Sequence, residues 1–248
     1  MKKALFFLSL LTAGMAPTLN AQNVDSKEKI KRLLAQVNYE KNLSEKDLFE
    51  IAITDEYVSN TSGTKHIYLR QMVDGLEILG TESSLHLDKN GELVVGHNFF
   101  LNSLERRKRG NSTPKISAAE AVTAAASHLK YAITEPITAL SQESLAGKKT
   151  LLSRGGISLS DIPAQLRYQL LEDGSFTLVW DLSIEAVSKA EWYNVRVDAQ
   201  TGTVINKVNW TSSCGITCSH AHDDVDHCED EEYSDTVSTS ENYNLQPS

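Results

Sequence analysis

Apolar residues recur along the chain first at helical and then at strand spacing. In residues 26–37 they lie three or four positions apart, which predicts a short amphipathic helix. Ser44, with Asp47 three positions on, is typical of a helix start ahead of Leu48. Beyond it the period falls to two, and this alternation predicts an antiparallel meander of strands at residues 49–58, 65–72, 81–88 and 93–101.

The same succession returns in the second half of the chain. Ser117 is an expected N-cap with Glu120 three residues on, followed by an Ala-rich helix that reaches about Lys130. Residues 134–160 are mostly polar with scattered Gly and Pro, which predicts irregular structure. Alternation then predicts strands at residues 164–171, 176–187, 191–198 and 204–210.

Turn and linker signals divide these segments. The residues from Asp88 to Gly91 include an Asn-Gly pair, which tolerates the positive φ of a hairpin turn. Residues 105–115 contain the basic run Arg106 to Arg109 and end in a Gly- and Pro-punctuated stretch, which marks a domain boundary. We interpret the basic run as a solvated linker, with a processing site for a protease of basic specificity as the alternative.

The amino terminus has the three parts of a secretory signal. Lys2 and Lys3 give a positive start, residues 4–16 are apolar but too few to span a membrane, and Ala21 offers a small residue at the cut. We expect a signal peptide at residues 1–21, a secreted, soluble mature chain, and no membrane partner once the signal is removed.

Charge is concentrated at the other end of the chain. Residues 208–248 hold nine of the 33 acidic residues and none of the 24 Lys and Arg residues, so the body of the chain is neutral. Nucleic-acid binding requires a basic footprint, and we therefore expect no nucleic-acid partner. With few apolar residues to offset the entropy of ordering, residues 211–240 are expected to be a disordered acidic linker.

Catalytic motifs are missing from the sequence. It contains no His-Glu-x-x-His zinc pair, no Gly-x-Ser-x-Gly elbow and no phosphate-binding Gly loop. Asp181 and Glu185 flank an apolar strand segment and could be paired carboxylates, but solvent-facing strand residues are the simpler interpretation. We assign no catalytic and no cofactor-binding residue to this chain.

Two groups of segments resemble the pro-regions of fungalysin-type metallopeptidases. Residues 66–80 and 85–94 resemble the fungalysin/thermolysin propeptide motif: a strand ending in Gln71, an apolar segment after Gly75, and a strand leading to the Asn-Gly hairpin. The PepSY-like part of the same pro-regions is similar to residues 116–121, 178–182 and 194–205. The resemblance covers residues 43–210, most of the mature chain.

The resemblance implies an α+β fold of two tandem cystatin-like modules, each a helix packed on an antiparallel sheet, at residues 22–104 and 116–210. Ile67, Leu69, Leu178, Trp180 and Leu182 are expected to face the helices. Residues 241–248 resemble the start of a catalytic domain that does not follow, so we interpret the chain as part of a longer precursor.

The function implied is that of an intramolecular chaperone and inhibitor of a secreted zinc metallopeptidase, whose catalytic domain is the expected partner and holds the zinc. A free-standing secreted peptidase inhibitor or binding module is one alternative. A metal-binding protein is another, because the acidic linker carries a cluster of potential ligands: Cys214, Cys218, His220, His222, His227 and Cys228.

The same cluster has other interpretations. In an exported chain a disulfide is favoured, between Cys214 and Cys218 or between either of them and Cys228. The segment could also be a linker without a function of its own, or could present a free thiol or imidazole to the partner's catalytic zinc. We therefore assign no metal site to these six residues.

Overall fold

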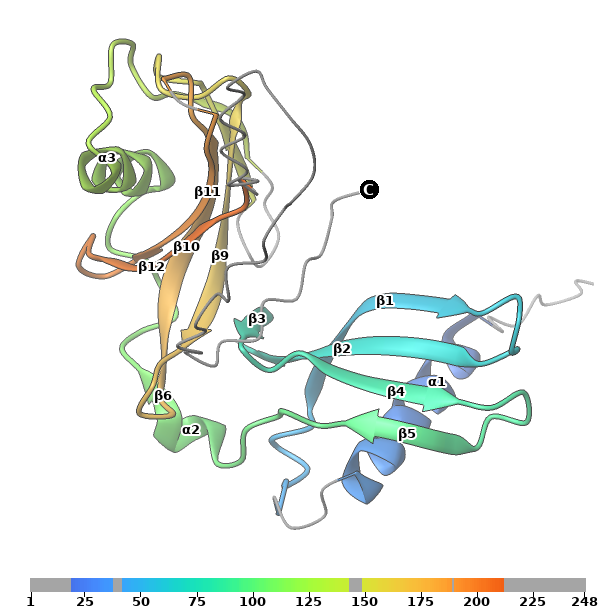
Figure 1. Ribbon diagram of the computed structural model, residues 1–248. Helices are drawn as coiled ribbons and strands as arrows, with labels where there is room; N and C mark the ends of the chain where they lie inside the picture. Colours follow the sequence, from blue (N-terminus) through green and yellow to red (C-terminus); the bar gives the residue numbers. More distant parts are fainter. Residues whose placement is uncertain (1–18, 38–41, 143–148, 189, 212–248) are drawn as a thin grey trace, which may run out of the picture. The chain divides into compact units, whose positions relative to one another are not determined.

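The computed structural model describes residues 19–37, 42–142, 149–188 and 190–211, with side chains from residue 27 onward. It is an α+β structure with few helices and a mostly antiparallel sheet (Figure 1). We call the elements up to β5 the N-terminal half and those from α2 onward the C-terminal half. The N-terminal half comprises α1 (Leu19–Gln36), β1 (Glu50–Val58), β2 (Lys65–Val73), β3 (Leu76–Leu79), β4 (Ser83–Leu87) and β5 (Leu93–His97).

The C-terminal half carries a helix and a larger set of strands. Its elements are α2 (Leu104–Arg107), β6 (Lys108–Arg109), α3 (Ala118–Leu129), β7 (Ala139–Gln142), β8 (Thr150–Leu152), β9 (Ile162–Leu170), β10 (Phe176–Glu185), β11 (Trp192–Asp198) and β12 (Val204–Asn209). The predicted helices at residues 26–37 and 117–130 and all eight predicted strand segments therefore correspond to elements of the structure, with shifted ends.

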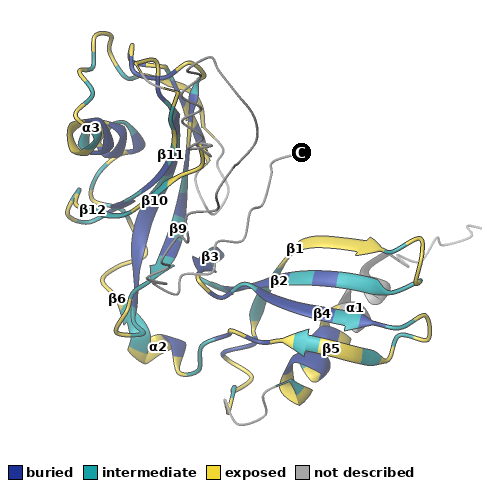
Figure 2. Cartoon of the chain, viewed as in Figure 1, coloured by how far each residue is buried: buried dark blue, intermediate teal, exposed yellow. Residues whose placement is uncertain are grey.

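The N-terminal core forms between α1 and one face of its sheet. Ile30, Leu33 and Leu34 of α1 join Ile67 and Leu69 of β2 in one buried apolar cluster (Figure 2). Strand alternation places every second residue of β2 on this face, which confirms the predicted direction of Ile67 and Leu69. The β4–β5 hairpin has the predicted turn.

That turn is held by one carboxylate. The Asp88 side chain accepts hydrogen bonds from the backbone N–H groups of Asn90 (2.8 Å) and Glu92 (2.9 Å), and Gly91 has a φ of +80°. The hydrogen bond from the Glu92 N–H is the main cause that lowers the pKa of Asp88. The positive φ explains why Gly follows Asn here.

The C-terminal core forms between α3 and the β8–β12 strands. Ala121, Val122 and Ala125 of α3 share a buried cluster with Leu178, Trp180 and Leu182 of β10, so the predicted direction of these three strand residues is confirmed. The predicted cap is also present: the Ser117 hydroxyl accepts from the Glu120 N–H, and the Glu120 carboxylate accepts from the Ser117 N–H.

The two halves share one hydrogen-bonded sheet path. Its order is β12-β11-β10-β9-β3-β2-β4-β5, and the join is a short parallel pairing in which Ile78 and Leu79 of β3 lie beside Tyr168 and Gln169 of β9. The Tyr168 hydroxyl donates to the Asp74 carboxylate at 2.9 Å across the same join. Sequence periodicity does not predict β3, because it is only four residues long.

Three local predictions differ from the structure. Ser44 and Asp47 make the hydrogen bonds of a cap, but residues 45–48 form a single turn and no helix follows, because β1 begins at Glu50. Residues 134–160, expected to be irregular, contain the short strands β7 and β8, which pair with each other, and β8 also pairs with β9. Their brevity hides the alternation that reveals longer strands.

The third difference concerns the basic run. Instead of a solvated linker, the described residues 104–109 form α2 and β6, and Lys108 and Arg109 pair in parallel with Phe176 and Thr177 of β10. Arg107 donates to the carbonyl oxygens of Asn102 (2.7 Å) and Gly174 (3.0 Å). The basic residues of this run therefore have partners in the fold. Arg107 binds backbone carbonyls, and Lys108 and Arg109 pair with the carboxylates of Asp74 and Asp173.

Candidate functional site

The face of the β9–β12 strands that turns away from α3 is the strongest candidate for a binding surface. Because alternate residues of β10 enter the core, Asp181 and Ser183 must point the other way. We call this surface the open face and define it by Gln165, Arg167, Asp181, Ser183, Trp192, Asn194, Arg196 and Trp210.

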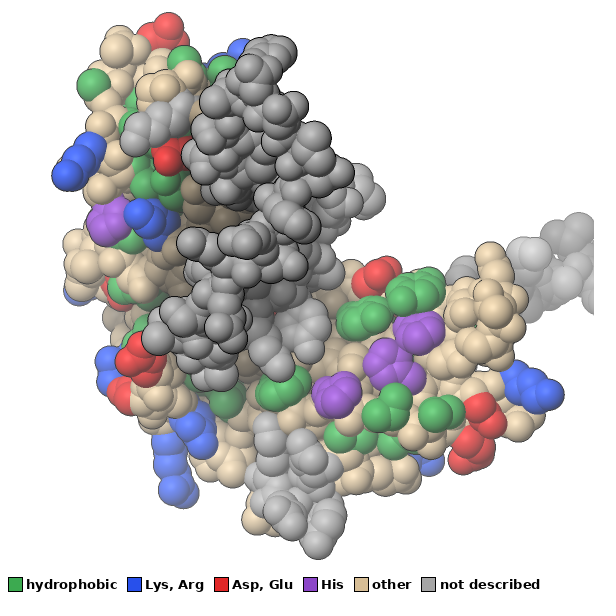
Figure 3. Space-filling model, viewed as in Figure 1, with side chains coloured by type: hydrophobic (Ala, Val, Ile, Leu, Met, Phe, Trp, Pro, Cys, Tyr) green, Lys and Arg blue, Asp and Glu red, His purple; other side chains and the backbone are tan. Residues whose placement is uncertain are grey.

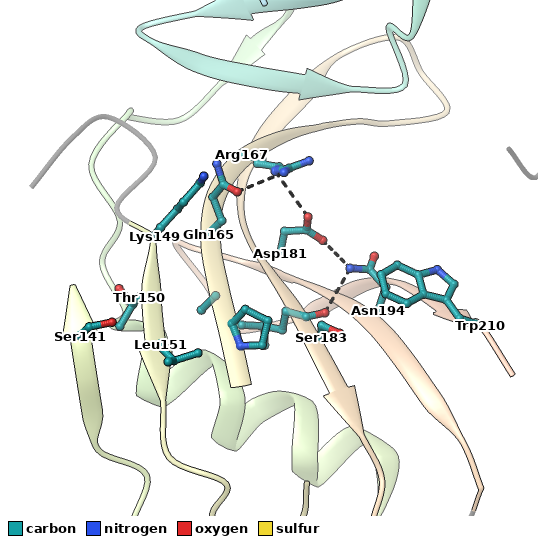
Figure 4. Close-up of a pocket in the computed structure, with 13 residues that line it drawn as sticks. Ser141, Lys149, Thr150, Leu151, Gln165, Arg167, Asp181, Ser183, Asn194 and Trp210 are labelled. Carbon is teal, nitrogen blue, oxygen red and sulfur yellow. Dashed lines mark hydrogen bonds and ion pairs between the residues drawn. The ribbon is translucent and has the colours of Figure 1, made fainter. Parts of the chain in front are cut away.

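Asp181 lies at the centre of the open face. Its carboxylate lies 3.6 Å from Arg167 Nε and accepts a hydrogen bond from Asn194 Nδ2 at 2.8 Å (Figure 4). Arg196 Nε is 3.5 Å from the same carboxylate. Arg196 also donates to Gln169 Oε1 at 2.7 Å. The carboxylate is thus held between two guanidinium groups, and its neighbours fix it in place.

This arrangement continues as a row of alternating charges into the N-terminal half. Arg70 pairs with Glu77 and, at 3.1 Å, with Glu82, and Glu77 is 3.5 Å from Arg167. We call the row the charge ladder; its members are Glu82, Arg70, Glu77, Arg167, Asp181 and Arg196. Three acids and three bases cancel, so the ladder holds strands β2, β3, β9, β10 and β11 together without a net charge.

A hollow of about 400 Å³ lies on the open face beside Asp181. Its wall includes Gln165, Ser183 and Trp210, and Lys149 and Leu151 close it on the β8 side (Figure 4). Polar groups line much of the hollow, and the Trp210 ring lies at one end. Such a surface offers both hydrogen-bonding groups and an apolar anchor point.

Two tryptophans form the apolar end of the open face. The rings of Trp192 and Trp210 meet edge to face, with centroids 5.3 Å apart, and the side chains are 37% and 48% exposed. Trp192 Nε1 donates to Ser183 Oγ at 2.7 Å, which fixes its ring. Pre-ordered, exposed tryptophans are the residues that most often dominate protein–protein binding energy.

The alternative in which Asp181 and Glu185 are paired carboxylates does not fit the structure. Asp181 and Glu185 lie four residues apart on one strand, which separates them by roughly 13 Å. Asp181 is engaged by two arginines rather than facing a second acid. The structure therefore gives Asp181 a positioning role on the open face.

The proposed metal ligands lie beyond the described residues. Cys214, Cys218, His220, His222, His227 and Cys228 all belong to residues 212–248, so their interpretation stays a prediction. In the part of the chain that the structure describes, no group of three or more His, Cys, Asp or Glu side chains could hold a metal ion.

Sequence reasoning missed the other members of the open face. The sequence does carry a signal for these residues, because polar side chains recur at every second position and therefore share one face of a strand. Examples are Gln165 and Arg167 on β9, and Asn194 and Arg196 on β11. Alternation gives the face of each strand, but it does not give the register between strands that brings Arg167 and Arg196 to Asp181.

The Fungalysin/Thermolysin Propeptide Motif matches residues 50–95. The match starts at the first residue of β1 and ends within β5, so it covers the sheet of the N-terminal half. These residues therefore place the chain in the class of proteins that carry a metallopeptidase propeptide motif.

Similar proteins agree with this class. The chain is 27% identical over 162 residues to "Extracellular metalloproteinase mep" of Aspergillus niger, a match that covers 64% of this chain and 25% of that protein. It is 31% identical over 164 residues to the protein of the same name from Aspergillus terreus, covering 63% and 24%. The chain is thus similar to a fungalysin/thermolysin propeptide motif over residues 50–95 and, over about 160 residues, to part of fungal extracellular metalloproteinases.

The chain matches about a quarter of the length of these curated relatives. Among solved structures, the Bacillus megaterium YpeB C-terminal domain aligns with 80% of this chain and 68% of its own, at 13% identity and a TM-score of 0.33. Among the described residues, no helix combines the length and apolar character that crossing a membrane would require.

Proposed function

We propose that this chain is the pro-region of a secreted fungalysin-like zinc metallopeptidase and that it assists the folding of the catalytic domain and keeps it latent. The observation that carries the proposal is the propeptide motif at residues 50–95, which coincides with the N-terminal sheet. The extracellular relatives support secretion of the precursor. The zinc belongs to the catalytic domain, which is the partner of this chain.

The proposed fold description is two cystatin-like modules joined through one sheet path. Each half has a helix packed on an antiparallel sheet, α1 in the N-terminal half and α3 in the C-terminal half. Residues 116–210 are the PepSY-like module in this proposal. The short β3–β9 pairing joins the strands of the two modules.

We assign the contact with the catalytic domain to the open face. Trp192 and Trp210 provide apolar anchors, the hollow beside them receives a side chain, and Arg167, Asp181 and Arg196 provide fixed polar partners around it. A pro-region bound through this face would cover the enzyme and exclude substrate from its cleft. After cleavage of the connecting chain, only the binding strength would retain it.

Inhibition in trans tests the proposal. The purified chain is added over a concentration series to a mature fungalysin-type peptidase, and hydrolysis of a peptide substrate is followed. We expect dose-dependent inhibition that spares an unrelated zinc peptidase. A chain that unfolds cooperatively, and is therefore folded, but does not inhibit would refute the inhibitory role.

One variant pair locates the contact. Trp210→Ala removes the more exposed anchor and is expected to weaken inhibition by about 10- to 100-fold, the loss typical of a binding hot spot. Leu159→Ala is the control, because Leu159 is also a large exposed side chain (53%) but does not line the hollow. Equal inhibition by both variants would show that the contact does not lie on the open face.

A further inference from the structure

A cluster of histidines lies on the N-terminal sheet, on the face opposite α1. Because Ile67 and Leu85 point toward α1, the alternate residues His66 and His86 point away from it. We call this surface the histidine face; it consists of Tyr57, His66, Tyr68, His86, Val95 and His97. Figure 3 shows histidine side chains gathered on this part of the surface, with hydrophobic side chains beside them.

Strand register brings these residues into two rows. In the first row Tyr57 of β1, His66 of β2, His86 of β4 and Val95 of β5 are direct cross-strand neighbours. In the next row the neighbours are Asp55, Tyr68, Ser84 and His97. Two imidazoles therefore lie directly opposite each other on paired strands.

The two imidazoles share a hydrogen bond. His66 Nδ1 and His86 Nδ1 are 2.7 Å apart, and the ring planes meet at 70°. At this distance one Nδ1 must carry a proton and the other must accept it. His86 Nε2 lies 3.1 Å from Ser84 Oγ, which provides a partner for its second nitrogen.

The pair tolerates one positive charge but not two. With one added proton, the imidazolium donates to its neutral neighbour in a charge-assisted hydrogen bond. The Tyr57 ring stacks on His66 at 4.8 Å and 19°, and an aromatic face stabilises a cation at that ring. A second proton would turn the Nδ1–Nδ1 contact into two N–H groups that oppose each other, each on a charged ring.

Among the described residues, the cross-strand row that contains the pair has no acidic side chain. The groups that face the pair are Tyr57 and Asp55 from β1, Tyr68 from β2, Ser84 from β4 and His97 from β5. Asp55 lies one row away, opposite Tyr68, and its Oδ1 accepts from the Glu56 N–H. Glu56 itself pairs with Lys65 on the α1 side of the sheet.

The pKa of His86 agrees with this geometry. Burial lowers it first, and the charges of His66 and His97 lower it further below the ordinary imidazole value. When the pKa of a histidine is lower in the folded state than in the unfolded state, the fold keeps its full stability at pH values above the unfolded pKa of about 6.5. As the pH falls from there through the folded pKa, the unfolded state takes up the proton first and the folded state loses stability.

We propose that the His66–His86 pair is a pH-sensitive latch between β2 and β4, closed while the pair carries at most one added proton and opened when both rings are charged. The latch is a property of the chain alone. If the proposed function holds, acidification would loosen the half of the pro-region that carries the propeptide motif, and that consequence rests on the proposed function.

Replacement of one imidazole by an amide tests the latch. In His86→Asn the side-chain amide lies near the position of Nδ1 and can donate to or accept from His66 without becoming charged. The melting temperature of the full chain and of this variant is measured between pH 7.5 and 5. His128→Asn is the matched control, because His128 is exposed on α3, outside the histidine face.

We expect acidification to lower the melting temperature of the unaltered chain and of His128→Asn by at least about 2–4 °C more than that of His86→Asn, as a domain of this size shows for a small loss of stability. Equal pH profiles for all three proteins would overturn the latch. No peptidase is present, so the result is independent of whether the chain inhibits one.

A second measurement does not depend on the variant folding. The imidazole nitrogen signals of the ¹⁵N-labelled chain are followed by NMR through the same pH range. Spectra of His86→Asn or of His128→Asn, whichever variant folds, are used to assign these signals. We expect the ¹⁵N chemical shifts of the two facing Nδ1 atoms to show that His66 and His86 share a proton. We also expect the pH midpoint of the His86 titration to lie below about 6.5. A midpoint at or above this value, with independent titration of the two rings, would refute the proposal.

Discussion

At the scale of single residues, Gln71 has the greatest structural effect for its size. It is fully buried, its Nε2 donates to the carbonyl oxygens of Asp47 and Leu101 (both 2.8 Å), and its Oε1 accepts from the Leu101 N–H (2.8 Å). One amide thus binds the backbone of the segment before β1 and of the segment after β5. A strand residue that enters the core with polar atoms must find such partners.

Substitution Gln71→Leu is expected to lower the free energy of unfolding by about 2–4 kcal/mol, because three buried or partly buried backbone groups lose their hydrogen bonds to this amide. Urea unfolding followed by circular dichroism measures the loss. Gln165→Leu is the control, since Gln165 lies on the open face rather than in a core. A loss no greater than that of the control would show that water replaces the amide.

At the scale of elements, the capping box of α3 can be tested directly. Ser117→Ala removes the hydroxyl that accepts from the Glu120 N–H, and we expect a loss of about 0.5–2 kcal/mol in the free energy of unfolding. Ser127→Ala, at an exposed position of the same helix, is expected to leave the free energy of unfolding unchanged or to raise it slightly. Equal effects of both substitutions on the urea midpoint would contradict a capping role.

The sequence predicted those elements whose signals are local. The cap at Ser117 and the turn at Asp88 depend on residues within four positions of each other, and both are confirmed. The parallel pair β3–β9 depends on residues about 90 positions apart, and no periodicity reports such a pairing. The open face was missed for the same reason, since its arginines converge only through strand register.

At the scale of the whole described molecule, the charge ladder connects the two halves. Glu77 is its middle acid, shared by Arg70 and Arg167. The Arg70 side chain is only 9% exposed, so it depends on protein partners rather than on water. Removal of the Glu77 charge leaves two mostly buried arginines short of a partner.

We expect Glu77→Gln to lower the free energy of unfolding by about 1–3 kcal/mol. Glu56→Gln, in a more exposed pair with Lys65, is expected to cost at most about 1 kcal/mol. All three tryptophans lie in the C-terminal half, so their fluorescence reports that half and circular dichroism reports both. Separate transitions of the two signals in Glu77→Gln would show that the ladder couples the halves.

The pairing of β6 with β10 has a consequence for proteolysis. A protease of basic specificity needs an extended substrate, but here Arg107 is bound to backbone carbonyls and Lys108 and Arg109 are part of the sheet. Cleavage within the run therefore requires that β6 first detach. When opening is fast, the rate of such cleavage follows the population of the open form, so a trace of trypsin would report how often this edge of the sheet opens.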